Sequence, residues 1–183
     1  MMKTICILLM GFIYTAGLFA QRNPDWAVPV EAKAILNLYM VDTGVYRCAQ
    51  PDAEAFAELE QLGIRSVINL RYLCSDDQPA KATGLTLHHV KMMASNSDWD
   101  KLVKTLRIIK NRQGPIVIHC KHGSDRTGLV LALYRIVFQG WSKEAAIDEL
   151  ENGGYGFHTV YANIPSFIRN LDETALKKAV IQD

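Results

Sequence analysis

The most constraining feature of this chain is a short apolar run followed by a polar, glycine-containing segment and a longer apolar run. The three parts span residues 115–118, 119–128 and 129–138, and Gly140 closes the last of them. A short apolar run bounded by Gly or Pro is typical of a buried strand, whereas the longer run indicates a buried helix. Strand, loop and helix in this order form a geometry that binds phosphate, because loop amides and the helix N-terminus offer unpaired N–H donors.

The side chains of the polar segment indicate covalent chemistry on phosphate. Cys120 lies at its entry, and a helix N-terminus with nearby cations lowers a thiol pKa from ~8.5 to as little as ~3.5–7.5. Arg126 offers a planar fork that matches two phosphate oxygens. Thr127 can donate a hydrogen bond to the sulfur, and His119 is expected to position the loop and tune the sulfur. The pattern predicts attack by sulfur on phosphorus, with the oxygens held by Arg126 and the loop amides.

The whole loop is expected to surround the phosphate. The predicted phosphate-binding residues are Lys121, His122, Gly123, Ser124, Asp125 and Arg126. Lys121 and His122 add positive character at the mouth, or are simply solvent-exposed. Asp125 can orient the loop or Arg126, although its charge opposes a bound phosphate. A metal site on His119, Cys120 and His122 fits poorly, because tetrahedral sites draw their ligands from two separated pairs. No metal and no cofactor is therefore predicted.

These residues carry a family resemblance. The pattern His-Cys-x5-Arg-Thr/Ser is present at His119, Cys120, Gly123, Arg126 and Thr127. It resembles the signature of the cysteine-dependent protein tyrosine phosphatase superfamily. Residues 45–51 and 62–71 are similar to the small dual-specificity-like phosphatases of bacteria, and the similarity covers roughly residues 35 to 170. The resemblance implies a phosphocysteine on Cys120 that water then hydrolyses.

Several readings of the motif stay open. A cysteine after an apolar strand is often a small core residue. Arsenate reductases and rhodanese-like domains also place a cysteine before an anion-binding loop, but they are not expected to add the preceding histidine and the following Arg-Thr-Gly. Three function classes remain: a phosphatase for phosphotyrosine or phosphoserine/threonine in proteins, a phosphatase of inositol phosphates or phosphoinositides, and a weakly active phosphate-binding module. Lys121 and His122 favour the second class.

The general acid is harder to place. A carboxylic acid that protonates the departing oxygen speeds hydrolysis at neutral pH, and related phosphatases place an aspartate some tens of residues before the cysteine. Asp98 is the first candidate and Asp100 the second, because both follow a predicted strand that ends at the catalytic edge of the sheet. Either residue can instead cap the next helix, since aspartate is favoured at helix starts. Asp76 and Asp77 are further candidates.

The N-terminus predicts export. Met1-Met2-Lys3 and the apolar run that follows are typical of a secretory signal peptide over residues 1–20, with an uncleaved membrane anchor as the alternative. Residues 21–34 are interpreted as a linker or an arm on the domain, and 35–183 as a phosphatase domain. A periplasmic or secreted enzyme, without stable membrane association after cleavage, is expected. The net charge of +1 argues against a nucleic-acid partner.

The apolar pattern predicts an α/β fold with a mostly parallel central sheet flanked by helices. A hairpin is expected over 35–41 and 45–48, with further strands at 66–70 and 85–90. Helices are expected over 52–62, 98–111, 143–150 and 162–171. In such sheets the ligand lies at the carboxyl ends of the strands, where Cys120 falls.

The cysteines form a separate question. Removal of the leader leaves Cys48, Cys74 and Cys120, an odd number for an oxidising compartment. Both Cys48 and Cys74 follow strands that should be parallel to the one before Cys120. Three alternatives follow: a Cys48–Cys74 disulfide, a reversible bridge from one of them to oxidised Cys120, or isolated buried thiols.

Overall fold

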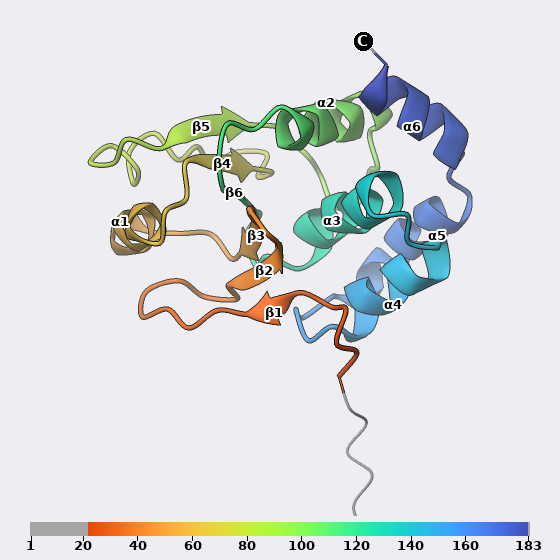
Figure 1. The fold of residues 1–183 in the computed structure, drawn as a ribbon, viewed down its shortest axis with the longest axis horizontal. Helices are drawn as coiled ribbons and strands as arrows, with labels where there is room; N and C mark the ends of the chain where they lie inside the picture. Colours follow the sequence, from red (N-terminus) through yellow and green to blue (C-terminus); the bar gives the residue numbers. More distant parts are fainter. Residues whose placement is uncertain (1–21, 183) are drawn as a thin grey trace, which may run out of the picture.

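The computed structural model describes residues 22–182, so the predicted signal peptide lies outside the described residues. These residues build one six-stranded sheet in the order β1-β2-β3-β6-β4-β5 (Figure 1). The strands are β1 (Val28–Pro29), β2 (Tyr39–Asp42), β3 (Val45–Cys48), β4 (Ser66–Asn69), β5 (Thr86–His89) and β6 (Ile116–His119). The last four are mutually parallel, while β1 and β2 add an antiparallel edge. The predicted α/β class is therefore confirmed.

Helices cover the sheet unequally. They are α1 (Ala53–Gln61), α2 (Trp99–Lys110), α3 (Asp125–Phe138), α4 (Lys143–Asn152), α5 (Asn163–Arg169) and α6 (Glu173–Ile181), with a 3₁₀ turn η1 at Thr159–Tyr161. Of these, α1 lies on one side of the sheet, and α2 to α6 lie on the other (Figure 1). Successive β6 side chains alternate between the two layers. Ile116 and Ile118 join the larger core under α2 and α3, and Val117 joins the smaller core under α1.

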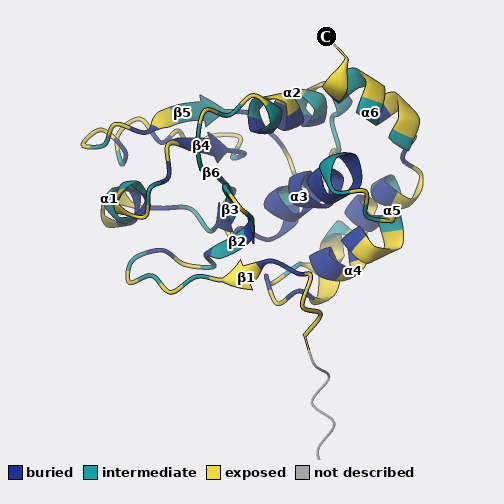
Figure 2. Cartoon of the chain, viewed as in Figure 1, coloured by how far each residue is buried: buried dark blue, intermediate teal, exposed yellow. Residues whose placement is uncertain are grey.

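Helix α3 is the most buried helix among the described residues, as Figure 2 shows by its dark colour. It begins at Asp125, four residues before the predicted start, so its first turn belongs to the polar loop. Ser124 occupies its N-cap without making a side-chain cap hydrogen bond. By contrast, the Asp98 and Ser142 side chains cap α2 and α4, the latter as predicted. The first N–H groups of α3 are thus left without a side-chain cap at the edge where the loop lies.

The C-terminal part contains more helix than the sequence indicated. The predicted helix over 162–171 is the shorter α5, and the unpredicted α6 follows it. Asp172 caps α6 by accepting a hydrogen bond from the Ala175 amide. Leu176 and Val180, four residues apart, are both fully buried against the core under α2. Two apolar residues at this spacing hold a helix through tertiary packing, which a short tail does not reveal on its own.

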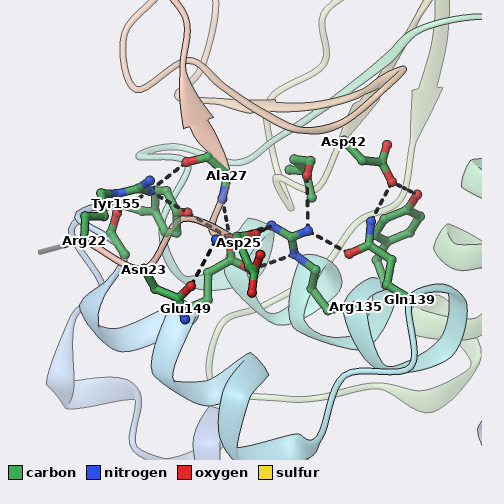
Figure 3. Close-up of polar contacts among 12 residues, drawn as sticks. Arg22, Asn23, Asp25, Ala27, Asp42, Arg135, Gln139, Glu149 and Tyr155 are labelled. Atoms are coloured by element: carbon green, nitrogen blue, oxygen red, sulfur yellow. Dashed lines mark hydrogen bonds and ion pairs between the residues drawn. The ribbon is translucent and has the colours of Figure 1, made fainter.

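Residues 22–34 lie on the domain. Trp26 and Ala27 are buried, and β1 pairs with β2. The Ala27 amide donates to Glu149 Oε1 at 2.7 Å, and Figure 3 shows this contact beside the ion pair of Arg135 with Glu149. Arg22 reaches the Tyr155 hydroxyl at 3.1 Å. Within residues 22–182, no helix combines the length and the apolar character needed to cross a membrane.

Candidate active site

The end of β6 places the candidate nucleophile. β6 is hydrogen-bonded on both sides, with His119 opposite Cys48 of β3 and Asn69 of β4. The Leu70 amide donates to the His119 carbonyl at 2.9 Å, so the strand is held up to its last residue. Cys120 follows at once and is 99% buried. The nucleophile therefore leaves the centre of the sheet in a fixed position.

The loop after Cys120 turns its carbonyl groups outward. Three successive carbonyl oxygens accept hydrogen bonds from the surrounding scaffold: Lys121 from the Gln50 amide at 3.1 Å, His122 from Asn37 Nδ2 at 2.8 Å, and Gly123 from Arg47 Nη2 at 2.6 Å. Since a trans peptide directs its N–H opposite to its carbonyl, the loop amides are left for the inner side. Successive inward N–H groups form an anion-binding nest.

Gly123 allows the loop to close against β3. Its φ is +73°, in the left-handed region that glycine adopts without strain. A Cβ at this position would lie within 3.0 Å of the Cys48 carbonyl oxygen, a distance that real Cβ atoms essentially never show. Any side chain here would therefore push the loop away from the strand that supports it.

The surroundings of Cys120 favour its thiolate. Burial by itself raises the pKa of a thiol, but here it is outweighed. The Thr127 hydroxyl and amide, the Arg126 charge and the Gly123 amide together hold the pKa of Cys120 below its ordinary value. The Thr127 Oγ1 atom is buried and has no other hydrogen-bond partner in the described part of the chain. This hydroxyl is therefore available to the sulfur.

Arg126 lies at the other end of the loop. Its Nη1 donates to the Met92 carbonyl at 3.4 Å, which brings the segment after β5 onto the loop. Its Nε is buried and has no partner among residues 22–182. A buried guanidinium nitrogen without a partner is costly unless an acceptor arrives. An anion in the nest supplies such an acceptor.

Asp76 supports the loop through its contact with His119. His119 is completely buried, and its Nε2 lies 2.8 Å from Asp76 Oδ2. The other Asp76 oxygen accepts from Asn69 Nδ2 at 2.9 Å and from Gln50 Nε2 at 3.0 Å. The sequence raised Asp76 as a possible general acid, but this carboxylate is buried and has three partners in the scaffold. Asp77, by contrast, is exposed.

The structure places both leading general-acid candidates at the start of α2, with Asp98 as its N-cap and Asp100 in its first turn. Asp98 accepts from the Lys101 amide at 3.3 Å and forms an ion pair with Lys101 Nζ at 3.0 Å. These contacts, the side-chain bond first, hold its pKa below the usual range. No hydrogen bond joins Asp98 to residues 119–128. Asp100 is exposed and lines a cavity away from the loop. Asp98 stays the predicted acid, and its observed contacts are those of a helix cap.

That cavity has a volume of about 730 Å³ and lies between α2 and the amino ends of β4 and β5. Its lining includes Arg65, Thr86, Trp99 and Asp100, and no residue of the catalytic loop. In parallel α/β sheets the chemistry takes place at the carboxyl ends of the strands. The hollow is therefore distinct from the site around Cys120.

The other predicted phosphate-binding residues divide into exposed and buried ones. Lys121 and His122 are exposed at the rim. Desolvation, followed by the charges of Lys121 and His158, lowers the pKa of His122. Ser124 is buried and donates to the Tyr155 carbonyl at 2.8 Å. Asp125, also buried, accepts from the His158 amide at 2.9 Å and thereby ties the start of α3 to a distant segment.

Sequence reasoning assigned no role to several supporting residues. Arg47 is fully buried, with its guanidinium 3.6 Å from the centroid of the Tyr155 ring. Burial lowers its pKa to about 10, which still leaves it charged at neutral pH. Asn37 has a φ of +56° and reaches both the His122 and Tyr155 carbonyls. An arginine inside an apolar strand is a signal that identifies Arg47, whereas nothing local identifies Asn37.

The described cysteines are all free thiols. Cys48 is buried, and burial together with the charge of Cys120 raises its pKa. Cys74 is half-buried, and its carbonyl accepts from Asn69 Nδ2 at 2.8 Å. The disulfide between Cys48 and Cys74 is thus not present. A reversible bridge to oxidised Cys120 stays a prediction.

Fold and site together define a cysteine-dependent phosphatase with an anion-binding loop. The model of the tyrosine phosphatase family matches residues 34–180, and the chain belongs to this family. It is 34% identical to the dual specificity protein phosphatase TpbA of Pseudomonas aeruginosa, over 94% of this chain and 79% of that protein. The predicted class, a bacterial dual-specificity-like phosphatase of the phosphoric monoester hydrolases, is confirmed.

Two further comparisons concern ligands. A crystal structure of P. aeruginosa TpbA, a cysteine-to-serine variant in complex with phosphotyrosine, matches with a TM-score of 0.80 and 32% identity. That match covers 89% of this chain and all of the other. The inositol diphosphatase DSP2 of Oryza sativa is 32% identical over 67% of this chain and 66% of its own length.

Proposed function

We propose that this enzyme is an exported phosphatase that hydrolyses phosphotyrosine in proteins through a phosphocysteine intermediate on Cys120. The observation that carries the proposal is the position of Cys120 at the entry of a loop whose Lys121, His122 and Gly123 carbonyls bond outward. The lowered pKa of Cys120 supports it. Phosphoserine and phosphothreonine are further proposed substrates. The phosphotyrosine complex of the similar TpbA variant supports the assignment of the tyrosine ester.

The proposed reaction has two displacements. The Cys120 thiolate attacks phosphorus, the S–P bond forms, and the P–O bond breaks with its electron pair leaving on the tyrosine oxygen. A general acid, with Asp98 as the predicted residue, protonates that oxygen. Water then attacks phosphorus and gives a proton to the deprotonated acid, the P–S bond breaks with its electron pair on sulfur, and inorganic phosphate departs as the thiolate and the acid are restored. Arg126 and the loop amides hold the charged oxygens throughout.

Export rests on the sequence of residues 1–20. A lysine near the N-terminus and an apolar run ending in Ala20 support a cleaved signal peptide and a periplasmic or secreted enzyme. The proposed partners are phosphorylated proteins or small phosphomonoesters, without a nucleic-acid partner and without stable membrane association after cleavage. The net charge of +1 supports this choice, because proteins that bind polyanions usually carry a marked positive excess.

Inositol phosphates are the second candidate substrate class. Lys121 is exposed at the rim of the loop, where an additional phosphate group of a polyphosphorylated ring would find a cation. The similarity to the inositol diphosphatase DSP2 supports this alternative. A panel of phosphotyrosine, phosphoserine and phosphothreonine peptides against inositol phosphates, compared by kcat/KM, decides between the two classes.

The substitution Cys120→Ser tests the covalent step. We expect turnover of an aryl phosphate to fall by at least about 10⁴-fold, the scale for loss of a nucleophile. Vanadate or phosphate binding should persist, because Arg126 and the amides are unchanged. Cys74→Ser is the matched control and should retain full turnover. Near-normal activity in Cys120→Ser would refute the intermediate, and an inactive wild-type protein would leave only a phosphate-binding module.

A further inference from the structure

A cluster of metal-ligating side chains lies beside the catalytic loop and has no part in the proposed displacements. It consists of His122 of the loop, Asp125 at the start of α3, and His158 before η1. One ligand atom from each lies within 4.8 Å of the other two. Residues far apart in the chain thus bring two imidazoles and a carboxylate to one point.

The distances suit a metal ion. Metal–nitrogen and metal–oxygen bonds of ~2.1 Å at a tetrahedral angle separate two neighbouring ligand atoms by about 3.4 Å. His158 Nδ1 lies 3.0 Å from one Asp125 oxygen and 3.1 Å from the other, close to that spacing. The rings of His122 and His158 have their centroids 5.2 Å apart. Both histidines are exposed, so a small rotation of His122 closes the remaining distance without repacking the core.

Asp125 gives the cluster a fixed anchor. Its carboxylate is buried, and the backbone amide of His158 donates to it at 2.9 Å. This bond holds the two segments together whether or not the His158 ring turns. A carboxylate that is already oriented by a backbone donor loses little freedom when an ion arrives.

We propose that His122, Asp125 and His158 bind one divalent transition-metal ion, with Zn²⁺ as the best match, at the rim of the catalytic loop. Imidazole ligands suit zinc, copper and nickel, whereas magnesium and calcium prefer sets of oxygen ligands. Three protein ligands leave a fourth position open to water. Lys121 and Arg126 lie nearby and oppose a cation, so the site is weaker than a four-ligand structural zinc site.

The alternative is that Asp125 and His158 form only an ion pair that docks the segment before η1. An ion pair predicts no saturable metal binding. It also predicts that His122, which makes no hydrogen bond through its ring to Asp125 in the described chain, is irrelevant to any binding that occurs. The contribution of His122 therefore separates the two readings.

Isothermal titration of the Cys120→Ser protein with Zn²⁺ tests the proposal, since this background removes the thiolate as a competing ligand. We expect one ion per chain. Adding His122→Gln or His158→Gln should weaken binding by at least about 10-fold, the loss that even outer partners of metal ligands cause. His88→Gln, a histidine of β5 outside the cluster, is the matched control and should bind normally.

Thermal unfolding provides a second measurement that guards against misfolded variants. An ion that binds only the folded chain raises its Tm. We expect Zn²⁺ to raise the Tm of the Cys120→Ser and Cys120→Ser/His88→Gln proteins, and to raise it much less in the two cluster variants. Absence of saturable binding overturns the proposal. Equal binding by folded His122→Gln and His158→Gln variants overturns it as well.

Discussion

Asp76 and Glu149 are both buried carboxylates that accept several hydrogen bonds near the catalytic loop, but their partners differ in kind. Glu149 pairs with the Arg135 guanidinium through bonds of 2.7 and 2.8 Å, and its Oε1 also accepts from the Ala27 amide and the Tyr155 hydroxyl (Figure 3). Among residues 22–182, no arginine or lysine binds Asp76. Its partners are two neutral amides and His119, the residue next to the nucleophile.

This difference gives the two carboxylates different roles: Glu149 stabilises the fold, whereas Asp76 positions the strand end that carries the nucleophile. Every donor to Glu149 belongs to the scaffold, and these bonds tie the segment 22–30 and helix α4 to α3. One donor to Asp76 belongs to the strand end that delivers Cys120. Tyr155 connects the two regions, because its hydroxyl meets Glu149 while its backbone carbonyl holds Ser124. The backbone contact does not require the hydroxyl, so we expect the two regions to respond separately to substitution.

The largest loss of activity with little loss of stability is expected for substitution of Arg126. Arg126→Lys keeps the charge but removes the planar fork, so we expect kcat/KM to fall about 10²–10³-fold, the scale for loss of one oxyanion donor. The free energy of unfolding, from a urea titration, should change by less than about 1 kcal/mol. Arg65→Lys, in the cavity beside α2, is the control and should alter neither quantity. A stable and nearly fully active Arg126→Lys enzyme would remove Arg126 from the site.

Glu149→Gln is expected to lower the stability of the fold and to leave turnover nearly unchanged. Breaking a buried ion pair from one side costs about 3–5 kcal/mol, and an amide that retains some hydrogen bonds should fall at the lower end, about 3 kcal/mol. Turnover of the folded protein should stay within about 3-fold. Glu144→Gln on the same helix is the matched control, because its pair with Arg169 is exposed and such pairs contribute less than about 1 kcal/mol. Urea titration gives the stability and initial rates give the turnover.

The difference in the free energy of unfolding between wild type and Glu149→Gln should also depend on pH. Burial works to raise the pKa of Glu149, but Arg135, followed by the Ala27 amide and the Tyr155 hydroxyl, outweighs it and lowers that pKa. A lowered folded-state pKa gives stability that is present above the unfolded value of ~4.3 and is lost as pH falls through the folded one. The gap between wild type and Glu149→Gln should therefore be full at pH 7 and narrow below pH ~4.3. A gap that widens in acid would contradict this sign.

Asp98 provides a half-buried carboxylate for the same comparison. Asp98→Asn removes the acid but keeps the helix cap, since asparagine caps as well as aspartate. We expect hydrolysis of phosphotyrosine to slow by about 10²-fold, with a steeper dependence on leaving-group pKa and little effect on activated aryl phosphates. Asp100→Asn is the paired variant. If it alone shows the pattern, the acid is Asp100; if neither does, α2 does not provide the acid.

The parts of the site that the sequence predicted are those encoded within one short stretch. Strand, loop and helix around Cys120 are contiguous, so apolar runs and the Cys-to-Arg spacing were sufficient to place them. Ser142 was likewise found by its local cap signal. Helix α6 was not predicted, because the role of Leu176 and Val180 becomes evident only from their packing against the core under α2.

The supports of the loop could not be predicted in this way. Asn37, Arg47 and Tyr155 contact the loop from 85, 76 and 31 positions away along the chain, respectively, and no periodic pattern links them. Asp76 was considered only as an acid, because a carboxylate in a polar stretch gives no indication that three donors converge on it. Such contacts depend on the register of β3, β4 and β6, which a single sequence does not specify.

Asp76→Asn is expected to have the smallest effect, and it tests the comparison between Asp76 and Glu149 most directly. Three donors converge on the Asp76 oxygens, and an asparagine has one acceptor oxygen, so its amide group must face at least one donor. We expect kcat/KM to fall about 10-fold, within the range for loss of a positioning partner. Because His119 then holds Cys120 less firmly against Thr127 and the loop amides, the acid limb of the kcat/KM–pH profile should move to higher pH. Asp77→Asn, exposed and adjacent, is the control. A destabilised Asp76→Asn enzyme with an unmoved acid limb would show that Asp76, like Glu149, only holds the fold.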